Sequence, residues 1–354
     1  MRIDELQKIA KRRKLDRVLV CGQANIRALT GVNCDNAVVE LEMGRTGRRG
    51  RIGRELVKFY TDFRYVPMVH RVAPKLKCCD IRRLGAGAFR PRRIGYESSI
   101  SHAKFLELQK KFPRTTFVDI AKDLAAIRAV KMPEEIAGLR AAEKLNCEIW
   151  EAAQRKFRAG MTERQMARII RKMMIEKGDG EAFDTIVCVG RNAAECHHEP
   201  DDTVWNGREP VLVDMGVKLN GFCSDLTRNL VPSSSVSRLS SLYRQIYSLV
   251  FSANQAAIAA AKPGMTGKAL DKVAREVIRK GGFGRCFGHS LGHGVGYEIH
   301  EEPYASKKSM TVLKPGMLVT IEPGIYLEDN LGVRIEDLVL ITETGCEVLS
   351  SSAK

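Results

Sequence analysis

Residues 211–228, VLVDMGVKLNGFCSDLTR, contain two apolar runs that flank an Asn-Gly pair at residues 220–221. Asn-Gly in this context is a strong signal for a two-residue β-hairpin turn. Such a turn pairs positions whose numbers add to 441, so that Asp214 faces Thr227. A four-residue loop would instead place Asp214 and Asp225 opposite each other. In both registers the two carboxylates lie on one side of the hairpin, because side chains alternate along a strand.

A second pair of carboxylates, Glu322 and Glu336, stands in the segments TIEPG and GVRIED. A turn centred on Asp329 sets these two glutamates opposite each other. All four acids lie among Val, Leu, Ile and Met, where an unpaired buried charge is costly, and this disfavours the alternative of solvated strand residues. Between the pairs lies the segment 288–296, GHSLGHGVG, which contains His293. Four acids and an imidazole at one place indicate a compensating charge, which two divalent metal ions would supply.

This ligand set favours particular metals and a particular chemistry. One imidazole and four carboxylates suit Mn²⁺ or Co²⁺ and also accept Fe²⁺ or Zn²⁺. Two such ions can hold a bridging hydroxide and polarise a carbonyl, which hydrolyses an amide or ester without a serine or cysteine nucleophile. The oxyanion that forms needs hydrogen-bonding or cationic partners. His197, His289 and His300 are the available imidazoles, and Arg334 stands close to Glu336.

The composition is that of a globular protein with two domains. A chain of 354 residues is long enough for two cores, and its 44% hydrophobic and 28% charged residues are ordinary values. The first residues are too charged for a signal peptide, and no run of about 18 apolar residues occurs. Ten cysteines without a CxxC pair fit a reducing compartment. We therefore expect a cytoplasmic protein without a membrane partner.

The positive charge is concentrated in the first third of the chain. Residues 1–132 contain 30 Lys and Arg against 13 Asp and Glu, a net charge of +17, and the remainder has a net charge of −1. Five arginines cluster in a Gly-rich stretch that is typical of an exposed hairpin tip: Arg45, Arg48, Arg49, Arg51 and Arg54. An acidic partner or a nucleic acid is one interpretation. A solvated loop is favoured over a nucleic-acid site, because no RNA-binding motif with interleaved aromatic residues accompanies the cluster.

The pattern along the chain predicts an α/β (α+β) protein. Strands are expected at 17–21, 37–41 and 56–60, with a short turn at 25–31, in a domain that ends near residue 120. Helices are expected from Pro133 to about 157, from 163 to about 177, over about 239–261 and over about 267–280. The expected domains are 1–125 and 126–354. The two carboxylate hairpins suggest that the second domain has two structurally similar halves.

Five motifs in register carry a family resemblance. They are SDLTR at 224–228, GHGVG at 292–296, HEEP at 300–303, IEPG at 321–324 and RIED at 334–337. Upstream, FDTIV and NAAECH lead to His197, and NIRALTG and YTDFRY occur near the N-terminus. In order and spacing these segments resemble the aminopeptidase P/prolidase family of dinuclear metallopeptidases. The resemblance implies a creatinase/prolidase-type α/β domain followed by a catalytic domain with the pita-bread fold.

The resemblance also implies a role for each site residue. The implied metal ligands are Asp214, Asp225, His293, Glu322 and Glu336, of which Asp225 and Glu336 bridge the two ions. Glu322 would also carry the proton from the attacking water to the leaving proline nitrogen. His197, His289 and His300 would bind substrate, and Arg334 would support the ligands. His197 is preferred to its neighbour His198, because the family histidine falls five residues after Asn192.

One departure from the family pattern bears on specificity. Prolidases often have an arginine after the His-Glu-x-Pro segment, where it can hold a dipeptide's carboxylate, and here that position is Tyr304. The leading hypothesis is therefore an Xaa-Pro aminopeptidase that acts as a homodimer on proline-containing peptides. A prolidase restricted to Xaa-Pro dipeptides is the near alternative. A metal-free binding protein that uses the basic first third is the alternative of another class. A methionine aminopeptidase is disfavoured, because those enzymes generally lack the N-terminal domain.

Overall fold

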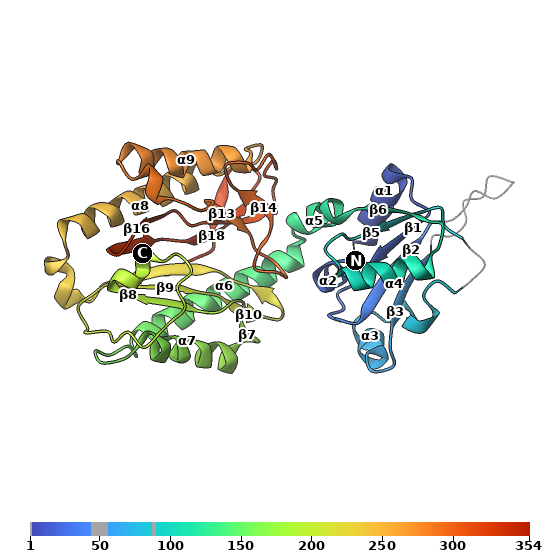
Figure 1. Cartoon of the computed structure of the whole chain (residues 1–354), viewed down its shortest axis with the longest axis horizontal. Helices are drawn as coiled ribbons and strands as arrows, with labels where there is room; N and C mark the ends of the chain where they lie inside the picture. Colours follow the sequence, from blue (N-terminus) through green and yellow to red (C-terminus); the bar gives the residue numbers. More distant parts are fainter. Residues whose placement is uncertain (1, 44–55, 87–89) are drawn as a thin grey trace. The chain divides into compact units, whose positions relative to one another are not determined.

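The computed structural model describes residues 2–43, 56–86 and 90–354 and forms two compact units, Met1–Arg128 and Ala129–Lys354 (Figure 1). The cluster of five arginines between residues 45 and 54 lies outside the described residues. The exposed hairpin tip therefore stays a prediction.

The first unit is built on a six-stranded sheet with the strand order β4-β3-β2-β1-β5-β6. Neighbours β1, β2 and β3 are antiparallel, whereas β4, β5 and β6 pair in parallel with the strands beside them. The bounds are β1 Arg17–Val20, β2 Ala37–Glu42, β3 Leu56–Thr61, β4 Lys77–Asp80, β5 Arg93–Tyr96 and β6 Thr116–Asp119. The strands predicted from residues 17, 37 and 56 are thereby confirmed.

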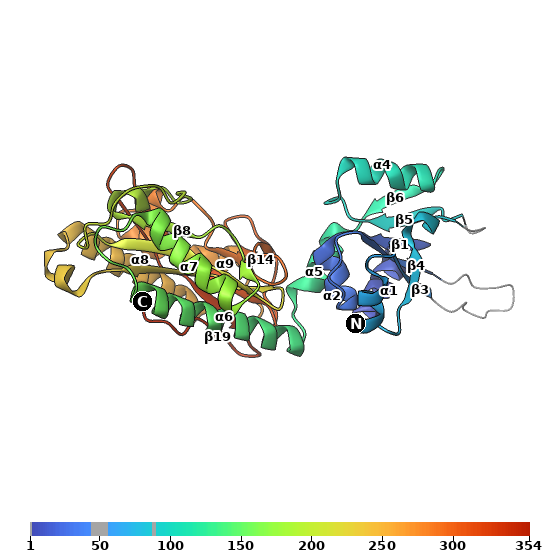
Figure 2. The same cartoon turned by 90° about the horizontal axis from the view of Figure 1, so that it is seen from below.

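Helices cover both faces of this sheet. Alternation along β1 sends Val18 and Val20 to one face and Leu19 to the other, so each face has its own apolar core. Helix α4 packs on the Leu19 face, and the remaining helices of the unit pack on the opposite face (Figure 2). The helices are α1 Ile3–Arg13, α2 Gln23–Thr30, α3 Val66–Val72, α4 His102–Lys111 and α5 Ala121–Ala129, with a 3₁₀ turn η1 at Ile81–Arg83.

The turn predicted at residues 25–31 is wrong, because this segment belongs to helix α2. Ile26 and Leu29 are both fully buried, and this spacing is that of one helix face. Gly31 follows the helix with φ of 79°, and its N–H bonds to the carbonyl of Arg27. A glycine in this left-handed conformation is a common helix C-terminus. The glycine therefore ends a helix here rather than forming a free-standing turn.

The second unit has two halves (Figure 1). In each half a pair of long helices covers the outer face of the strands. Helices α6 and α7 pack on strands that precede residue 231, and α8 and α9 pack on strands that follow residue 290. The helices are α6 Pro133–Gln154, α7 Glu163–Lys177, α8 Ser241–Ala260 and α9 Gly267–Lys280, with 3₁₀ turns η2 Gly190–Ala194, η3 Ser233–Arg238 and η4 Gly284–Cys286.

The strands of the second unit form short sheets that carry the predicted carboxylates. The first half contains the sheets β12-β9-β8 and β11-β10-β7, and the second contains β15-β18-β19, β16-β17 and β13-β14. The bounds are β7 Gly180–Glu181, β8 Ile186–Val189, β9 Val211–Met215, β10 Val217–Leu219, β11 Phe222–Cys223, β12 Leu226–Leu230, β13 Gly292–Gly294, β14 Glu301–Ala305, β15 Leu318–Ile321, β16 Gly324–Leu327, β17 Leu331–Arg334, β18 Asp337–Ile341 and β19 Cys346–Val348.

The four long helices begin where their capping residues predict. Pro133 occupies the first turn of α6, where its missing N–H costs nothing. The hydroxyls of Thr162, Ser240 and Thr266 each accept a backbone N–H at the start of α7, α8 and α9. The helices predicted from the sequence are thereby confirmed to within a few residues. No helix in the described ranges is long and apolar enough to cross a membrane.

Candidate active site

The first hairpin positions Asp214 and Asp225. Asp214 on β9 faces Thr227 on β12, and the turn residues Asn220 and Gly221 have φ of 50° and 70°. Positive φ at both central residues defines the tight turn that Asn-Gly favours. The register with pair numbers adding to 441 is confirmed, and the four-residue loop is excluded.

The second hairpin positions Glu322 and Glu336. Ladder partners in β15–β18 and in β16–β17 have numbers that add to 658. The two glutamates lie between these ladders and so share the predicted register. Asp329 in the connecting turn has φ of 55°, a conformation that Asp tolerates better than most residues. The hairpin therefore brings a second pair of carboxylates to the interior of the unit.

His293 on β13 lies between the two hairpins. Its Nε2 atom is 3.5 Å from Oδ2 of Asp225 and 3.5 Å from Oε1 of Glu322. Its Nδ1 lies 3.1 Å from the carbonyl oxygen of Gly294, to which it can donate. This bond leaves Nε2 with a free lone pair that faces the carboxylates. One ligand atom each of Asp225, His293 and Glu336 lie within 4.8 Å of one another, as a metal site requires.

The charge at this place is unbalanced in the protein alone. Burial raises the pKa of Asp225 and of Glu336 well above the usual carboxyl range, and neighbouring carboxylates raise both further. Burial also raises the pKa of Glu322 to about 8. Burial and the nearby His300 lower the pKa of His293 to about 4, which keeps its ring neutral and able to bind a cation. These directions are those expected where buried acids lack a counter-ion.

Arg334 forms its ion pair with Asp214. Its Nη2 donates to Oδ2 of Asp214 at 2.7 Å, its Nε donates to the Thr227 hydroxyl at 3.1 Å, and its Nη1 donates to the Tyr326 hydroxyl at 2.9 Å. The Tyr326 hydroxyl is also 2.9 Å from Nε2 of His289. Oδ1 of Asp214 is buried and has no hydrogen-bond partner. Such an orphaned oxygen is what a metal ligand would show before its ion is added.

The acids and imidazoles line one cavity of about 330 Å³. All nine predicted site residues line it: His197, Asp214, Asp225, His289, His293, His300, Glu322, Arg334 and Glu336. Burial and the charge of Arg334 lower the pKa of His289 to about 4, and burial lowers that of His300. Both rings are therefore neutral near pH 7 and able to donate or accept a hydrogen bond.

His198 points away from this cavity. Its Nε2 is 2.7 Å from Oε2 of the fully buried Glu163 on α7. The other oxygen of Glu163 accepts the N–H of Val189 at 2.6 Å and the amide of Asn192 at 2.9 Å. Because both oxygens have partners, this cluster fits a structural anchor for the loop that carries His197.

Two further residues, Glu143 and Thr227, form hydrogen bonds with the ligand residues. Neither was predicted from the sequence as a site residue. The fully buried Glu143 on α6 accepts the backbone N–H of Asp225 at 3.2 Å and the hydroxyl of Ser350 at 2.6 Å. The Thr227 hydroxyl donates to Oε2 of Glu336 at 2.7 Å. The position of Thr227 in the SDLTR motif was a usable signal, whereas the role of Glu143 depends on long-range packing that no local pattern reveals.

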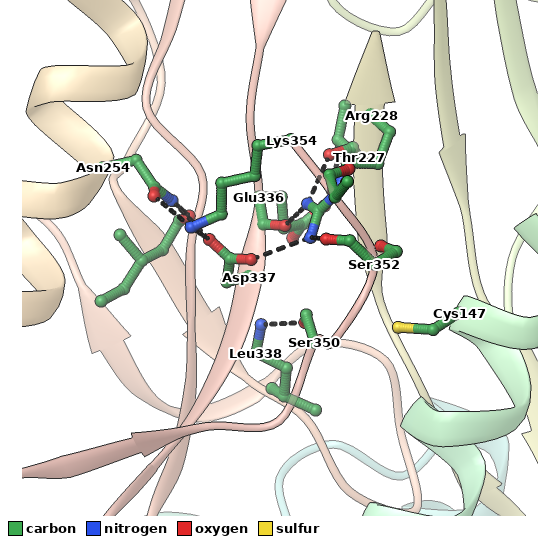
Figure 3. A network of polar contacts seen from close by, with 12 residues as sticks. Cys147, Thr227, Arg228, Asn254, Glu336, Asp337, Leu338, Ser350, Ser352 and Lys354 are labelled. Carbon is green, nitrogen blue, oxygen red and sulfur yellow. Dashed lines mark hydrogen bonds and ion pairs between the residues drawn. The ribbon is translucent and has the colours of Figure 1, made fainter. Parts of the chain in front are cut away.

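Arg228 ties the same region to the chain's last residues (Figure 3). The buried guanidinium donates to the carbonyl of Glu336, to Oδ1 of Asp337 at 3.0 Å and to the carbonyl of Ser352 at 3.0 Å. Oδ2 of Asp337 lies 2.6 Å from the amine of Lys354. The carbonyl of Glu336 and the residue that follows it are thus held by a charged network.

This arrangement defines a class of protein. A pocket of histidines and buried carboxylates in which one carboxylate oxygen has no partner fits divalent metal ions, and such a centre is typical of a metal-dependent hydrolase. Residues 137–343 match the model of metallopeptidase family M24, and residues 2–130 match the creatinase/prolidase N-terminal domain. The chain belongs to the M24 family, in its aminopeptidase P/prolidase branch, and is an exopeptidase.

Relatives and solved structures agree with this membership. A protein named Xaa-Pro dipeptidase from Pyrococcus furiosus is 39% identical over 74% of this chain and 74% of its own. The solved prolidase from the same organism has a TM-score of 0.88 at 32% identity and covers 98% of this chain and 99% of its own. The solved X-Pro aminopeptidase from Thermotoga maritima has a TM-score of 0.85 at 28% identity, with coverages of 99% and 97%. The similarity thus extends to both kinds of enzyme.

Proposed function

We propose that this protein is a metal-dependent Xaa-Pro aminopeptidase, which removes the N-terminal residue that precedes proline from peptides longer than a dipeptide. The observation that supports it most is the orphaned, buried Oδ1 of Asp214 among four other ligand side chains in one cavity. The similar proteins from P. furiosus and T. maritima, named for Xaa-Pro substrates, support the choice of bond.

Five side chains would hold the ions. Asp225 and Glu336 would be shared by two ions, Asp214 would complete the first set of ligands, and His293 with Glu322 would complete the second. Two divalent ions supply an activated water and polarise the peptide carbonyl when they are bound. Arg334 fixes the orientation of Asp214 through its 2.7 Å hydrogen bond, so that the unpaired oxygen faces the cavity.

Glu322 moves the proton. Its carboxyl takes a proton from the attacking water and gives it to the proline nitrogen as the bond breaks. The Thr320 hydroxyl, 3.2 Å from Oε1, holds this carboxyl in place. His197, His289 and His300 bind the peptide and donate hydrogen bonds to the oxygen on which charge develops.

Tyr304 favours an aminopeptidase over a strict dipeptidase. Its side chain is 38% exposed and lines the cavity. Among the described residues that line the cavity, Arg334 carries the one permanent positive charge, and it already pairs with Asp214. A dipeptide's carboxylate therefore lacks a guanidinium partner there. The second candidate, a prolidase, is favoured by several similar proteins that are named Xaa-Pro dipeptidase.

Peptides of different length distinguish the two candidates. Metal-free protein is loaded with Mn²⁺, Co²⁺ or Zn²⁺, and hydrolysis of Ala-Pro is compared with that of Ala-Pro-Ala and longer peptides. We expect kcat/KM to be highest for a peptide longer than two residues. Exclusive hydrolysis of the dipeptide would establish the prolidase alternative. Absence of hydrolysis with every metal, together with salt-sensitive RNA binding, would favour the metal-free binding protein.

The identity of the metals, the homodimer and the cytoplasmic location stay predictions. Mn²⁺ or Co²⁺ is preferred because the ligands are mainly carboxylate oxygens. A nucleic-acid partner is not favoured.

A further inference from the structure

A second hollow adjoins the metal cavity. It has a volume of about 390 Å³ and shares His289 and Ser290 with the metal cavity. Five residues line this hollow but not the metal cavity: Arg275, Gly288, Ser306, Lys307 and Lys308. No acidic side chain lines it, so it has a positive character next to a cavity rich in carboxylates.

The two lysines are the available cations in this hollow. Lys307 and Lys308 are exposed, and neither pairs with an acid in the part of the chain that the structure describes. Arg275 is already occupied, since it pairs with Asp271 at 2.7 Å and donates to the carbonyl of His289 at 2.8 Å. An incoming anion would therefore meet the lysine amines rather than the guanidinium.

The turn that carries the lysines is fixed to the metal site. It follows strand β14, which pairs with β13 and so with the segment that contains His293. The N–H of Ser309 bonds to the carbonyl of Ser306 at 3.1 Å, and the N–H of Lys268 on α9 bonds to the carbonyl of Ser309 at 2.8 Å. A Cβ on Gly267 would lie 2.0 Å from the Tyr304 carbonyl, so α9 packs closely on this strand. The backbone that carries the two lysines is thus anchored beside the cavity.

A peptide of three residues that is cleaved before proline carries its C-terminal carboxylate one residue beyond the proline. Among the described side chains that line the metal cavity, Arg334 is the one permanent cation, and it pairs with Asp214. Each residue after proline carries the C-terminal carboxylate at most about 3.3–3.6 Å further along the chain. The adjoining hollow is a positive surface that shares lining residues with the metal cavity.

We propose that Lys307 and Lys308 bind the C-terminal carboxylate of Xaa-Pro-Xaa peptides and so select short peptides with a free C-terminus over dipeptides. This inference rests on the proposed Xaa-Pro aminopeptidase function. It makes the lysine pair a specificity determinant that takes the place of the guanidinium missing at Tyr304.

The test compares Ala-Pro-Ala with its C-terminal amide, using the metal-loaded protein. Because the amide would lose two exposed ion pairs, its KM should be about two- to thirtyfold higher, with kcat unchanged. The difference should shrink in about 0.5 M salt, because exposed charges are screened. The double variant Lys307→Ala/Lys308→Ala should raise the KM of the free acid to that of the amide and leave the amide's KM unaltered.

A matched control removes two lysines elsewhere. Lys144 on α6 and Lys172 on α7 are each 76% exposed, and their double alanine variant lowers the net charge equally. It should leave both KM values unchanged. Equal KM values for acid and amide in the wild type, or a lysine-pair variant that affects both alike, would overturn this inference alone. Absence of Xaa-Pro hydrolysis with every metal would overturn the proposed function and this inference together.

Discussion

The guanidinium of Arg334 lies 2.7 Å from Oδ2 of Asp214, while Oδ1 of the same carboxylate is buried without a partner. The arginine therefore uses one oxygen to fix the side chain and leaves the other for a cation. Arg334 comes from β17 and Asp214 from β9, so this bond also joins the two halves of the catalytic unit.

Arg334→Lys is expected to lower kcat/KM by about 10- to 100-fold, as is usual when a group that orients a metal ligand is changed. Lysine keeps the charge but cannot bond Asp214, Thr227 and Tyr326 at once. Steady-state kinetics and metal titration of the same samples check this. Arg140→Lys, at an exposed pair with Glu347, is the control and should leave kcat/KM unchanged. An Arg334→Lys enzyme with wild-type kinetics would show that the bond does not orient Asp214.

The metal-free protein should lose stability as the pH rises from about 7 to 8.5. Glu322 has its pKa raised to about 8 in the folded protein, and burial raises that of Asp225 and Glu336 as well. The folded state then binds more protons than the unfolded state in this range, so a rise in pH favours unfolding. His293, whose pKa is lowered to about 4, is neutral in both states there and adds no opposing effect. Melting temperatures with and without Mn²⁺ test this, and a metal-free Tm that rises over this range would contradict it.

His197→Ala and His198→Ala should have different effects. His197 is exposed and lines the metal cavity, so its loss should lower kcat/KM with little change in stability. His198 is buried against Glu163, and its loss should lower the free energy of unfolding by about 1.5–3 kcal/mol. Urea denaturation and kinetics on both variants separate the roles. The reverse pattern would make His198 the substrate-binding histidine.

Arg228→Met should lower the free energy of unfolding by about 3 kcal/mol, because it leaves the buried Asp337 with less compensation. Removal of one partner of a buried ion pair usually costs about 3–5 kcal/mol. We expect the lower value because Lys354 and Asn254 also contact Asp337 (Figure 3). Arg140→Met at the exposed Arg140–Glu347 pair is the comparison and should cost at most about 1 kcal/mol. Equal losses in the two variants, measured by urea denaturation, would show that the network around Arg228 adds no special stability.

Local signals predicted the elements that decide the site. The Asn220-Gly221 pair favoured the two-residue turn that the first hairpin has, and a turn centred on Asp329 gave the register of the second, because strand pairing follows from the turn. The starts of α6 and α7 could be predicted from Pro133 and Thr162, because a helix start depends on residues close together in the sequence.

The parts that the sequence did not reveal depend on contacts between distant segments. Glu143 lies 82 residues from Asp225, and Tyr326 reaches His289 across 37 residues. The segment that ends at Gly31 was predicted as a turn, because a glycine alone does not distinguish a turn from the end of a helix.

The most direct test of the central claim is metal stoichiometry measured together with activity. Metal-free protein is titrated with Mn²⁺ or Co²⁺ by calorimetry, and Xaa-Pro-Xaa hydrolysis is followed in the same samples. We expect two ions to bind per chain and hydrolysis to appear as they bind. His293→Ala should lose binding at one site and should lose turnover. A protein that hydrolyses the peptide equally well without metal, or that binds no ion at these carboxylates, would contradict this claim.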